Sequence, residues 1–319
     1  IRRPPRSTLD RSSAASDVYK RQIHYVFKLP TGVVINNLID DLRIFSWEAS
    51  EILLNYSQII KDPNCKKEII KTNHAEGPVT LADLNVNDLI IKRINENYKN
   101  VSWDILSEEN VKNSINNFDR NSKWLWILDP LDGTKDYIQG TGDYAMHLAL
   151  NYENHPYIGV VLIPEKNELW ISNGKNTWCE RRDGSLLKTN LSEMKNLEDM
   201  ILVTSRNHKN QKLNNLIEKV KFKKVNTMGS IGCKIASILR GESDIYISLS
   251  LPGKSCPKDW DFAAPEAILR AAGGSITDLE NNDLSYNKKD FRQEGIIIAS
   301  NNKKTHGSIC SQIKEIIQR

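Results

Sequence analysis

Two carboxylates follow a short apolar run near the middle of the chain, and their spacing points to a metal-assisted phosphate site. The segment 124–128 is apolar throughout, as in a buried strand, and Pro130 and Gly133 are typical of a turn after it. We therefore expect Asp129 and Asp132 to leave the strand end together on one tight turn. Carboxylates held that close repel one another unless cations lie between them, and hard oxygen ligands suit Mg²⁺. Asp and Gly are also common in capped turns, so this segment alone fits a purely structural turn as well.

Two further acidic segments lie at expected element boundaries in the first half of the chain. Thr80 can cap a helix that runs through Asp83 to about Tyr98. Glu108 and Glu109 follow a short apolar strand end, which puts both residues at its tip. Each of these carboxylates thus stands at the edge of an element.

A third acidic segment lies in the second half. Residues 258–274 (KDWDFAAPEAILRAAGG) predict an amphipathic helix, with Asp259 and Asp261 in its first turn and a glycine pair as its stop signal. Four acidic segments at element boundaries favour a metal site over an ordinary capped turn.

Taken together, these segments resemble the inositol monophosphatase superfamily, whose members are Mg²⁺-dependent, lithium-sensitive phosphatases. The resemblance runs from about Val34 to the C-terminus. The superfamily's DP(I/L)DGT signature is matched in full at 129–134 and its late WD motif at 260–261. Its strand-end glutamate motif is matched at 107–109, where Ser107 replaces the usual glycine. Single short motifs recur by chance, but these elements stand in the family's order and spacing.

Within the superfamily the chain is most similar to the 3′(2′),5′-bisphosphate nucleotidase branch, which includes the CysQ-type phosphatases. The segments 135–137 (KDY), 205–208 (SRNH) and 264–266 (APE) resemble motifs of that branch. The resemblance implies hydrolysis of the 3′-phosphate of 3′-phosphoadenosine 5′-phosphate, or of its 5′-phosphosulfate form, in sulfur assimilation or nucleotide recycling.

The resemblance also implies a site for two or three Mg²⁺ ions, with Asp129 bridging two of them. The implied ligands are the carboxylates of Glu108, Asp129, Asp132 and Asp261 and the carbonyl of Leu131. Thr134, with Asp83 accepting its hydroxyl proton, is the implied catalytic pair that orients the attacking water. Glu109 is expected to be an exposed neighbour of these ligands rather than a ligand itself.

A nucleotide with two phosphates needs cations and hydrogen-bond donors beyond the metals. The resemblance points to Ser205, His208, Ser230, Lys234 and Asp261 as substrate contacts. Arg206 is a further candidate because a guanidinium can hold a phosphate at two points. The backbone N–H groups of Gly133 and Thr134, at the start of the next helix, should point at the phosphate. Lys234 and His208 also keep ordinary alternatives, since a helix lysine is usually solvated and an isolated histidine usually lies at the surface.

Three rival functions fit part of the pattern. An inositol monophosphatase or a fructose-1,6-bisphosphatase-like sugar phosphatase stays open, because metal geometry is shared across the superfamily while a few pocket residues set specificity. A haloacid dehalogenase would need Asp-x-Asp-Gly-Thr, and this chain has one residue more between its carboxylates. A non-catalytic relative should have lost ligands, and none of the implied ones is replaced by an inert residue.

Composition indicates a cytoplasmic enzyme that acts on a small phosphate ester, without membrane or nucleic-acid partners. The 319 residues are 39% hydrophobic and include no apolar run long enough to cross a bilayer. Five cysteines without a C-x-x-C pair indicate reduced thiols. The net positive charge lies in residues 1–22, which resemble translated sequencing-adapter sequence and are expected to be a disordered, non-native prefix, although a basic tail is the conventional interpretation. Monomer and homodimer both stay open.

The element pattern predicts an α/β protein with two unlike halves. Residues 34–188 indicate an α+β half, with helices over 34–60 and 81–98 and short strands between 144 and 178. Residues 189–319 indicate an α/β half, with strands over 200–204, 244–248 and 295–300 and helices over 209–220, 230–240, around Trp260 and at the end. The resemblance implies a layered αβαβα sandwich with the metal site where the halves meet.

Overall fold

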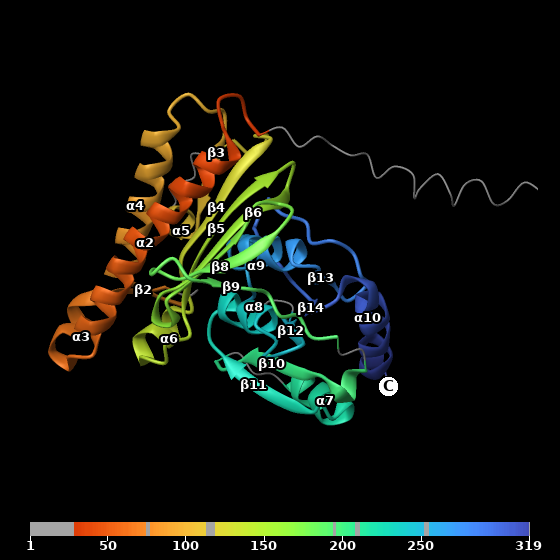
Figure 1. Ribbon diagram of the computed structural model, residues 1–319. Coiled ribbons are helices and arrows are strands. Elements are labelled where there is room, and N and C mark those ends of the chain that lie inside the picture. The colour runs from red at the N-terminus through yellow and green to blue at the C-terminus, as the bar shows by residue number, and fades with distance from the viewer. Residues whose placement is uncertain are drawn as a thin grey trace, which may run out of the picture.

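Helices and sheets alternate in five layers in the computed structural model, which describes residues 29–74, 77–112, 119–193, 196–207, 211–251 and 255–318 (Figure 1). A seven-stranded and a five-stranded sheet enclose a pair of buried helices, and each sheet carries further helices on its outer face. One apolar cluster lies under each outer helical layer, and a third surrounds the buried pair. The expected αβαβα layering is therefore confirmed.

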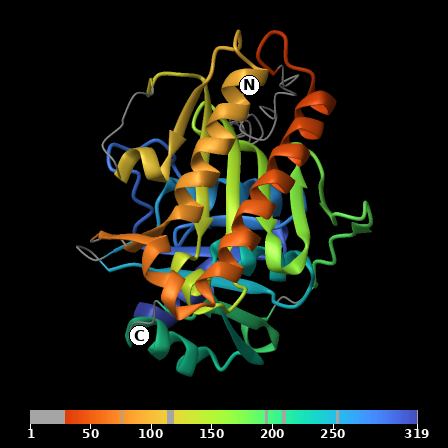
Figure 2. The ribbon, with the colours of Figure 1, turned by 90° about the vertical axis from the view of Figure 1, so that its left-hand side faces the viewer.

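The outer layer on the first sheet consists of α2 (Ile35–Ile60) and α4 (Leu81–Asn97), which lie side by side across its face (Figure 2). Both match the expected helices to within one residue at each end. α2 buries a stripe at three- and four-residue spacing, formed by Leu38, Leu42, Phe45, Ala49 and Leu53. Three short elements connect the two helices: α3 (Pro63–Ile69), β1 (Ile70–His74) and β2 (Gly77–Thr80).

The first sheet has the strand order β3-β4-β5-β6-β7-β8-β9. Its strands are β3 (Asp104–Ser107), β4 (Trp124–Asp132), β5 (Ala145–Tyr152), β6 (His155–Ile163), β7 (Glu168–Ser172), β8 (Thr177–Glu180) and β9 (Leu186–Leu187). β3 runs parallel to β4, and the other neighbouring pairs are antiparallel. Along β4, Trp124, Trp126 and Leu128 pack with the outer helices, whereas Leu125 and Ile127 face the buried ones. Two short helices flank this strand: α5 (Glu108–Lys112) and α6 (Thr134–Gln139).

The buried layer consists of α8 (Ile231–Leu239) and α9 (Asp259–Ala271). α9 is buried along most of its length, because it contacts the first sheet on one side and α8 and the second sheet on the others. The expectation of an amphipathic helix is therefore wrong. Small residues allow the close approach: an added Cβ at Gly159 of β6 would lie 2.6 Å from Ala267 Cβ and 2.8 Å from the Ala264 carbonyl oxygen. Packing thus requires glycine at position 159.

The second sheet has the order β11-β10-β12-β14-β13. Its strands are β10 (Ile201–Ser205), β11 (Lys224–Met228), β12 (Ile245–Leu249), β13 (Ser275–Asp278) and β14 (Ile296–Ser300). β10 is parallel to both neighbours, and β14 is antiparallel to both of its own. Helices α7 (Gln211–Val220) and α10 (Lys303–Gln318) lie on its outer face. The predicted strands and helices of this half are present, but β11 and β13 were not predicted.

Three expectations concern the chain as a whole. All five cysteines are free thiols, as expected. None of the helices in the described ranges is both long and apolar enough to cross a membrane. The expected prefix, residues 1–22, lies outside the described residues.

His306 of α10 should make the stability of this fold depend on pH. Its buried ring lies between two hydroxyl groups, with Nδ1 2.7 Å from Ser300 Oγ and Nε2 2.8 Å from Thr277 Oγ1. Burial lowers the pKa of His306 from 6.5 to about 4. The unfolded chain therefore binds this proton more readily. Stability from this group is complete above pH 6.5 and falls by roughly 3 kcal/mol as the pH approaches 4.

We expect His306→Gln to remove this component. In urea unfolding between about pH 7.5 and pH 5, the wild type should lose about 2 kcal/mol more stability than the variant. Equal losses in the two proteins would contradict the assignment to His306.

Candidate active site

One extra residue in β4 brings two carboxylates to the same face of the first sheet. Asp129 lies opposite His147 and Asp132 opposite Ala145 on β5, so three steps along β4 match two along β5. Because of this β-bulge, Leu131 packs with the outer helices and Asp132 shares the inner face with Asp129. The strand thus continues through both carboxylates. The expectation that they leave its end on a tight turn is wrong.

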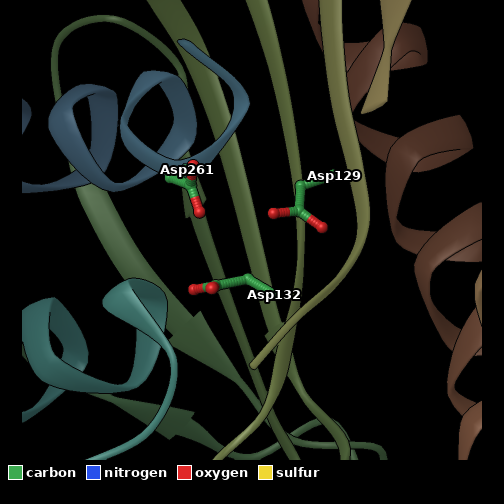
Figure 3. A group of neighbouring side chains, drawn as sticks. All are labelled: Asp129, Asp132 and Asp261. Atoms are coloured by element: carbon green, nitrogen blue, oxygen red, sulfur yellow. The ribbon is translucent and has the colours of Figure 1, made fainter. Parts of the chain in front are cut away.

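Asp261 completes a group of three carboxylates (Figure 3). It lies in the first turn of α9, and one oxygen from each of Asp129, Asp132 and Asp261 falls within 4.8 Å of the others. Asp261 Oδ2 accepts a hydrogen bond from the backbone N–H of Lys258 at 2.6 Å, as in a capping box. Burial, and then the charges of neighbouring carboxylates, raise the pKa of Asp129 and Asp261 well above the ordinary value. Such a group attracts cations.

The N-terminus of α8 fixes the direction of Asp132. Its Oδ2 accepts from Ser230 Oγ at 2.6 Å and from the backbone N–H groups of Ile231 and Gly232 at 2.5 and 3.4 Å. His147 Nε2 lies 3.4 Å from the same oxygen, and burial lowers the pKa of this histidine. Donors at a helix N-terminus stabilise an ionised carboxylate. Ser230, expected as a substrate contact, thus also holds a candidate metal ligand.

Glu108 and Glu109 begin α5 directly after β3, as expected, and both contact one ammonium group. Lys112 Nζ lies 2.8 Å from Glu108 Oε1 and 3.2 Å from Glu109 Oε1, and the lysine side chain is only 7% exposed. Glu109 is buried, so the expectation that it is exposed is wrong. Lys112 was not among the predicted site residues, although its spacing of three and four residues from two acidic residues was a usable signal.

Thr134 and Asp83, the expected catalytic pair, lie within reach of one another. Thr134 Oγ1 donates to the Leu131 carbonyl at 3.1 Å and lies 3.4 Å from Asp83 Oδ1. The other oxygen of Asp83 accepts from the backbone N–H of Thr80 at 2.8 Å and from its hydroxyl, which closes the capping box of α4. Burial raises the pKa of Asp83 to about 7, against the opposing effect of Thr80. The Asp83 carboxylate can therefore exchange a proton near neutral pH.

The charges of this site fit divalent cations. The described residues that form it include six carboxylates, those of Asp83, Glu108, Glu109, Asp129, Asp132 and Asp261. The buried ammonium groups of Lys112 and Lys234 offset two of these charges when all groups are ionised. Four negative charges remain, as many as two divalent cations neutralise. Oxygen ligands suit Mg²⁺, and the donor set therefore fits the metal implied by the resemblance.

Lys234 is buried beneath the site rather than solvated on its helix. The side chain is part of the buried face of α8, and Nζ donates to the Gly229 carbonyl and lies 5.3 Å from the ring centroid of Tyr246. Burial lowers the pKa of Lys234. The ordinary alternative of a solvated lysine is thus wrong, while its contact with substrate stays a prediction.

Gly133 has a left-handed backbone, with φ +88°, at the start of α6. An added Cβ would lie 3.0 Å from the Asp143 carbonyl oxygen and 3.2 Å from the Ser230 nitrogen, so the turn requires glycine. The position lies where the two halves meet, and its contact with the phosphate stays a prediction.

The segment expected to contact the substrate after β10 is described only in part. Ser205 is the last residue of β10 and is partly buried. His208 lies outside the described residues. The Arg206 guanidinium contacts Asp136, which belongs to the KDY segment, and Asp143, and neither carboxylate was predicted to be its partner.

We expect Lys112→Met to lower the melting temperature of the metal-free protein and to enlarge the rise that Mg²⁺ causes. Without the ammonium group, Glu108 and Glu109 lose their partner in a largely buried position, which costs about 3 kcal/mol. Thermal unfolding in EDTA and in excess Mg²⁺ measures both effects. Lys92→Met, which removes an exposed pair with Glu96 on α4, is the matched control. A Mg²⁺ shift no larger than that of the control would contradict the pairing of Lys112 with the site.

Comparisons with known proteins identify similar sequences. A sequence model of the Inositol monophosphatase family matches residues 42–318. The chain is 33% identical over 209 residues to 3′(2′),5′-bisphosphate nucleotidase CysQ of Buchnera aphidicola, which covers 66% of this chain and 74% of that protein. It is 25% identical over 260 residues to the protein of the same name from Aggregatibacter actinomycetemcomitans, with 81% of this chain and 90% of that one covered.

Solved structures share the fold. The extragenic suppressor protein suhB from Bartonella henselae superimposes with a TM-score of 0.68 at 20% identity, over 89% of this chain and 99% of that one. An IMPase from Thermotoga maritima gives a TM-score of 0.67 at 20% identity, over 89% and 98%. Because the family model spans most of the chain and the residues of its matched motifs converge on one site, the protein belongs to the inositol monophosphatase family.

Proposed function

We propose that this family member is a Mg²⁺-dependent bisphosphate nucleotidase. It removes the 3′-phosphate of 3′-phosphoadenosine 5′-phosphate to give AMP and phosphate, and it acts likewise on the 5′-phosphosulfate form. The observation that carries the proposal is the convergence of Asp129, Asp132 and Asp261 beside the Thr134 and Asp83 pair. The choice of branch is supported by relatives at 25 and 33% identity that are named as bisphosphate nucleotidases. A cytoplasmic location in sulfur assimilation or nucleotide recycling is part of the same proposal.

The chain's oxygen ligands would hold the metal. These are Glu108, Asp129, Asp132 and Asp261 through their carboxylates and Leu131 through its carbonyl, for two or three ions. Bound Mg²⁺ supplies positive charge for the phosphate oxygens and a more acidic water.

Thr134 and Asp83 would handle the proton of the attacking water. As the water oxygen bonds to phosphorus, the bond to the ribose O3′ breaks, and the departing O3′ takes up a proton from solvent. Thr134 Oγ1 accepts a proton from the attacking water and passes its own to Asp83, 3.4 Å away. A pKa of about 7 lets Asp83 accept that proton near neutral pH. The Thr80 hydrogen bonds keep the carboxylate turned toward Thr134.

The rest of the substrate would be bound by the second half of the chain. Ser205, His208, Ser230 and Lys234 are the proposed contacts, with the N–H groups of Gly133 and Thr134 facing the scissile phosphate. A buried ammonium interacts more strongly with an anion than an exposed one, because water screens it less. Lys234 is therefore suited to the negative charge of a bisphosphate.

Asp129→Asn should abolish most activity while making the metal-free protein more stable. The substitution removes the central ligand, and we expect turnover to fall by about a hundredfold or more. It also removes one like charge from a buried cluster, so the melting temperature in EDTA should rise. Asp244→Asn is the contrasting control, because Asp244 is buried among donors from Ser192, Ile201 and Asn301 away from the site. It should lower the melting temperature and keep turnover. Wild-type turnover in Asp129→Asn would overturn the proposed site.

Substrate preference should be measured as Mg²⁺-dependent phosphate release from three esters. These are 3′-phosphoadenosine 5′-phosphate, inositol 1-phosphate and fructose 1,6-bisphosphate, at equal concentration. We expect the nucleotide to give the highest kcat/KM, since Lys234 and the donors near it suit a second phosphate. Preference for inositol or sugar phosphate would keep the metal site and overturn the nucleotide assignment. Release from none of them would contradict catalysis.

A further inference from the structure

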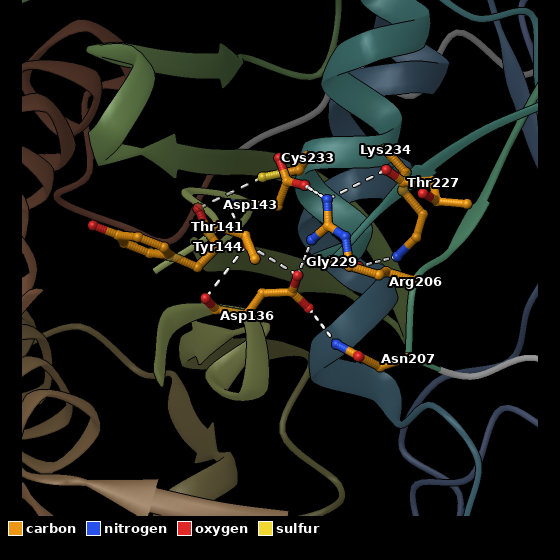
Figure 4. Close-up of polar contacts among 10 residues, drawn as sticks. All are labelled: Asp136, Thr141, Asp143, Tyr144, Arg206, Asn207, Thr227, Gly229, Cys233 and Lys234. Atoms are coloured by element: carbon orange, nitrogen blue, oxygen red, sulfur yellow. Dashed lines mark hydrogen bonds and ion pairs between the residues drawn. The ribbon is translucent and has the colours of Figure 1, made fainter. Parts of the chain in front are cut away.

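Arg206 joins the two halves of the molecule beside the active site. It directly follows β10 of the second sheet, and its guanidinium contacts Asp136 of α6 and Asp143 of the loop before β5 (Figure 4). Its backbone N–H donates to the Met228 carbonyl at 3.0 Å, which ties the same residue to β11. Arg206 therefore spans from the second sheet to the connection between β4 and β5 of the first.

The carboxylate of Asp136 is buried rather than exposed at the surface. Its side chain is 3% exposed. Oδ1 accepts from Arg206 and from Thr141 Oγ1 at 3.0 Å, and Oδ2 accepts from Asn207 Nδ2 at 2.7 Å. Two consecutive residues after β10 thus bind one carboxylate. A buried carboxylate without such partners is strongly unfavourable, so these contacts matter far more than an exposed ion pair would.

Gly229 leaves the space that this contact needs. An added Cβ at this position would lie 2.3 Å from Asp136 Cγ and 2.4 Å from the Asp143 carbonyl oxygen. Any side chain there would displace both acidic partners of Arg206. The ion pairs of Arg206 therefore require glycine at position 229.

Each acidic partner of Arg206 is connected to a residue of the proposed active site, either along the chain or through hydrogen bonds. Asp136 lies two residues after Thr134 on the same short helix. The Asp143 carbonyl accepts from the backbone N–H of Ser230 at 3.0 Å, and Ser230 Oγ donates to Asp132 at 2.6 Å. A shift of Arg206 would be transmitted to Thr134 by one route and to Asp132 by the other.

The same contacts argue against the expectation that Arg206 binds a substrate phosphate. Its guanidinium is shared between two carboxylates, so the three groups together carry a net negative charge. Such a group repels a phosphate unless the ion pairs break first.

We propose that Arg206 is a positioning residue, which holds the end of β10 and Asn207 against α6 and thereby fixes Thr134 and Asp132. This inference rests on the proposed phosphatase function. It assigns Arg206 to the geometry of the reaction and leaves recognition of the second phosphate to other residues.

The test compares Arg206→Met with wild type on two substrates. One is 3′-phosphoadenosine 5′-phosphate, and the other is adenosine 3′-monophosphate, which lacks the second phosphate. Methionine keeps an apolar stem but loses both ion pairs. Misplaced catalytic groups should lower kcat by roughly ten- to a hundredfold on both substrates, with the ratio of their kcat/KM values within about twofold of wild type. A selective loss on the bisphosphate would show that Arg206 binds the second phosphate and would overturn the proposal. Unchanged kinetics would overturn it as well.

Amide hydrogen exchange supplies a readout that does not depend on activity. In Arg206→Met the amides of Tyr137 and Gly140, bonded within and after α6, should exchange faster. Arg93→Met is the matched control, because Arg93 makes a similar two-point pair with Glu48 between α2 and α4, away from this junction. It should leave α6 exchange and kcat unchanged. Protected α6 amides in Arg206→Met would overturn the positioning role even if none of the esters is hydrolysed, which separates this failure from failure of the proposed function.

Two milder variants keep the test decisive if Arg206→Met does not fold. Arg206→Lys cannot span both carboxylates, and Asp143→Asn removes one of them. Each should give a smaller loss of kcat on both substrates and a smaller increase in α6 exchange. Wild-type behaviour in both variants would overturn the proposal.

Discussion

Like charges brought together in a region of low dielectric repel one another, and the residues around this site can be understood as responses to that repulsion. Each of these acidic groups has a local partner. Asp132 accepts hydrogen bonds from the N-terminus of α8, and Asp261 closes the capping box of α9. Glu108 and Glu109 contact the ammonium group of Lys112. Asp129 accepts from the Leu131 N–H at 3.0 Å. These local contacts fix the direction of the carboxylates but do not neutralise their total negative charge. The remaining negative charge is the property that makes the site suitable for divalent cations.

Elements with a strong periodic signal could be predicted from the sequence. The apolar stripe of α2 and the Thr80 capping box of α4 involve residues close together in the sequence. Such local patterns can be recognised without knowledge of the tertiary contacts. β11 was overlooked because it is an edge strand whose side chains are largely exposed, so it lacks the apolar run of a buried strand. α9 was predicted to be amphipathic, with the acidic residues Asp259 and Asp261 in its first turn. Asp259 is instead buried, with Oδ1 accepting from Gln293 Nε2 at 2.7 Å.

The three carboxylates that converge in the structure, those of Asp129, Asp132 and Asp261, were all named from motifs, but their geometry was not predicted. The bulge in β4 depends on the register with β5, which no pattern within β4 itself reveals. Pro130 was predicted to lie in a turn after the strand, whereas it lies within the bulge. The burial of Lys234 and the ion pairs of Arg206 depend on contacts between residues far apart in sequence. Whether a charged side chain is solvated or buried is decided by the partner surface, and a single sequence does not contain that information directly.

The middle position of α9 has a consequence for the mechanics of the molecule. This helix carries Asp261 and contacts both sheets, while Asp129 and Asp132 belong to the first sheet. The spacing of the three carboxylates is therefore set by how α9 lies on β6, where Gly159 meets Ala264 and Ala267 without room for a methyl group. Sliding of the helix along the sheet would separate the ligands, and a cation bound by all three would resist that sliding. By linkage, ion occupancy and the rigidity of the central layer should rise and fall together, so a bound cation would also stabilise the packing of α9 against the first sheet.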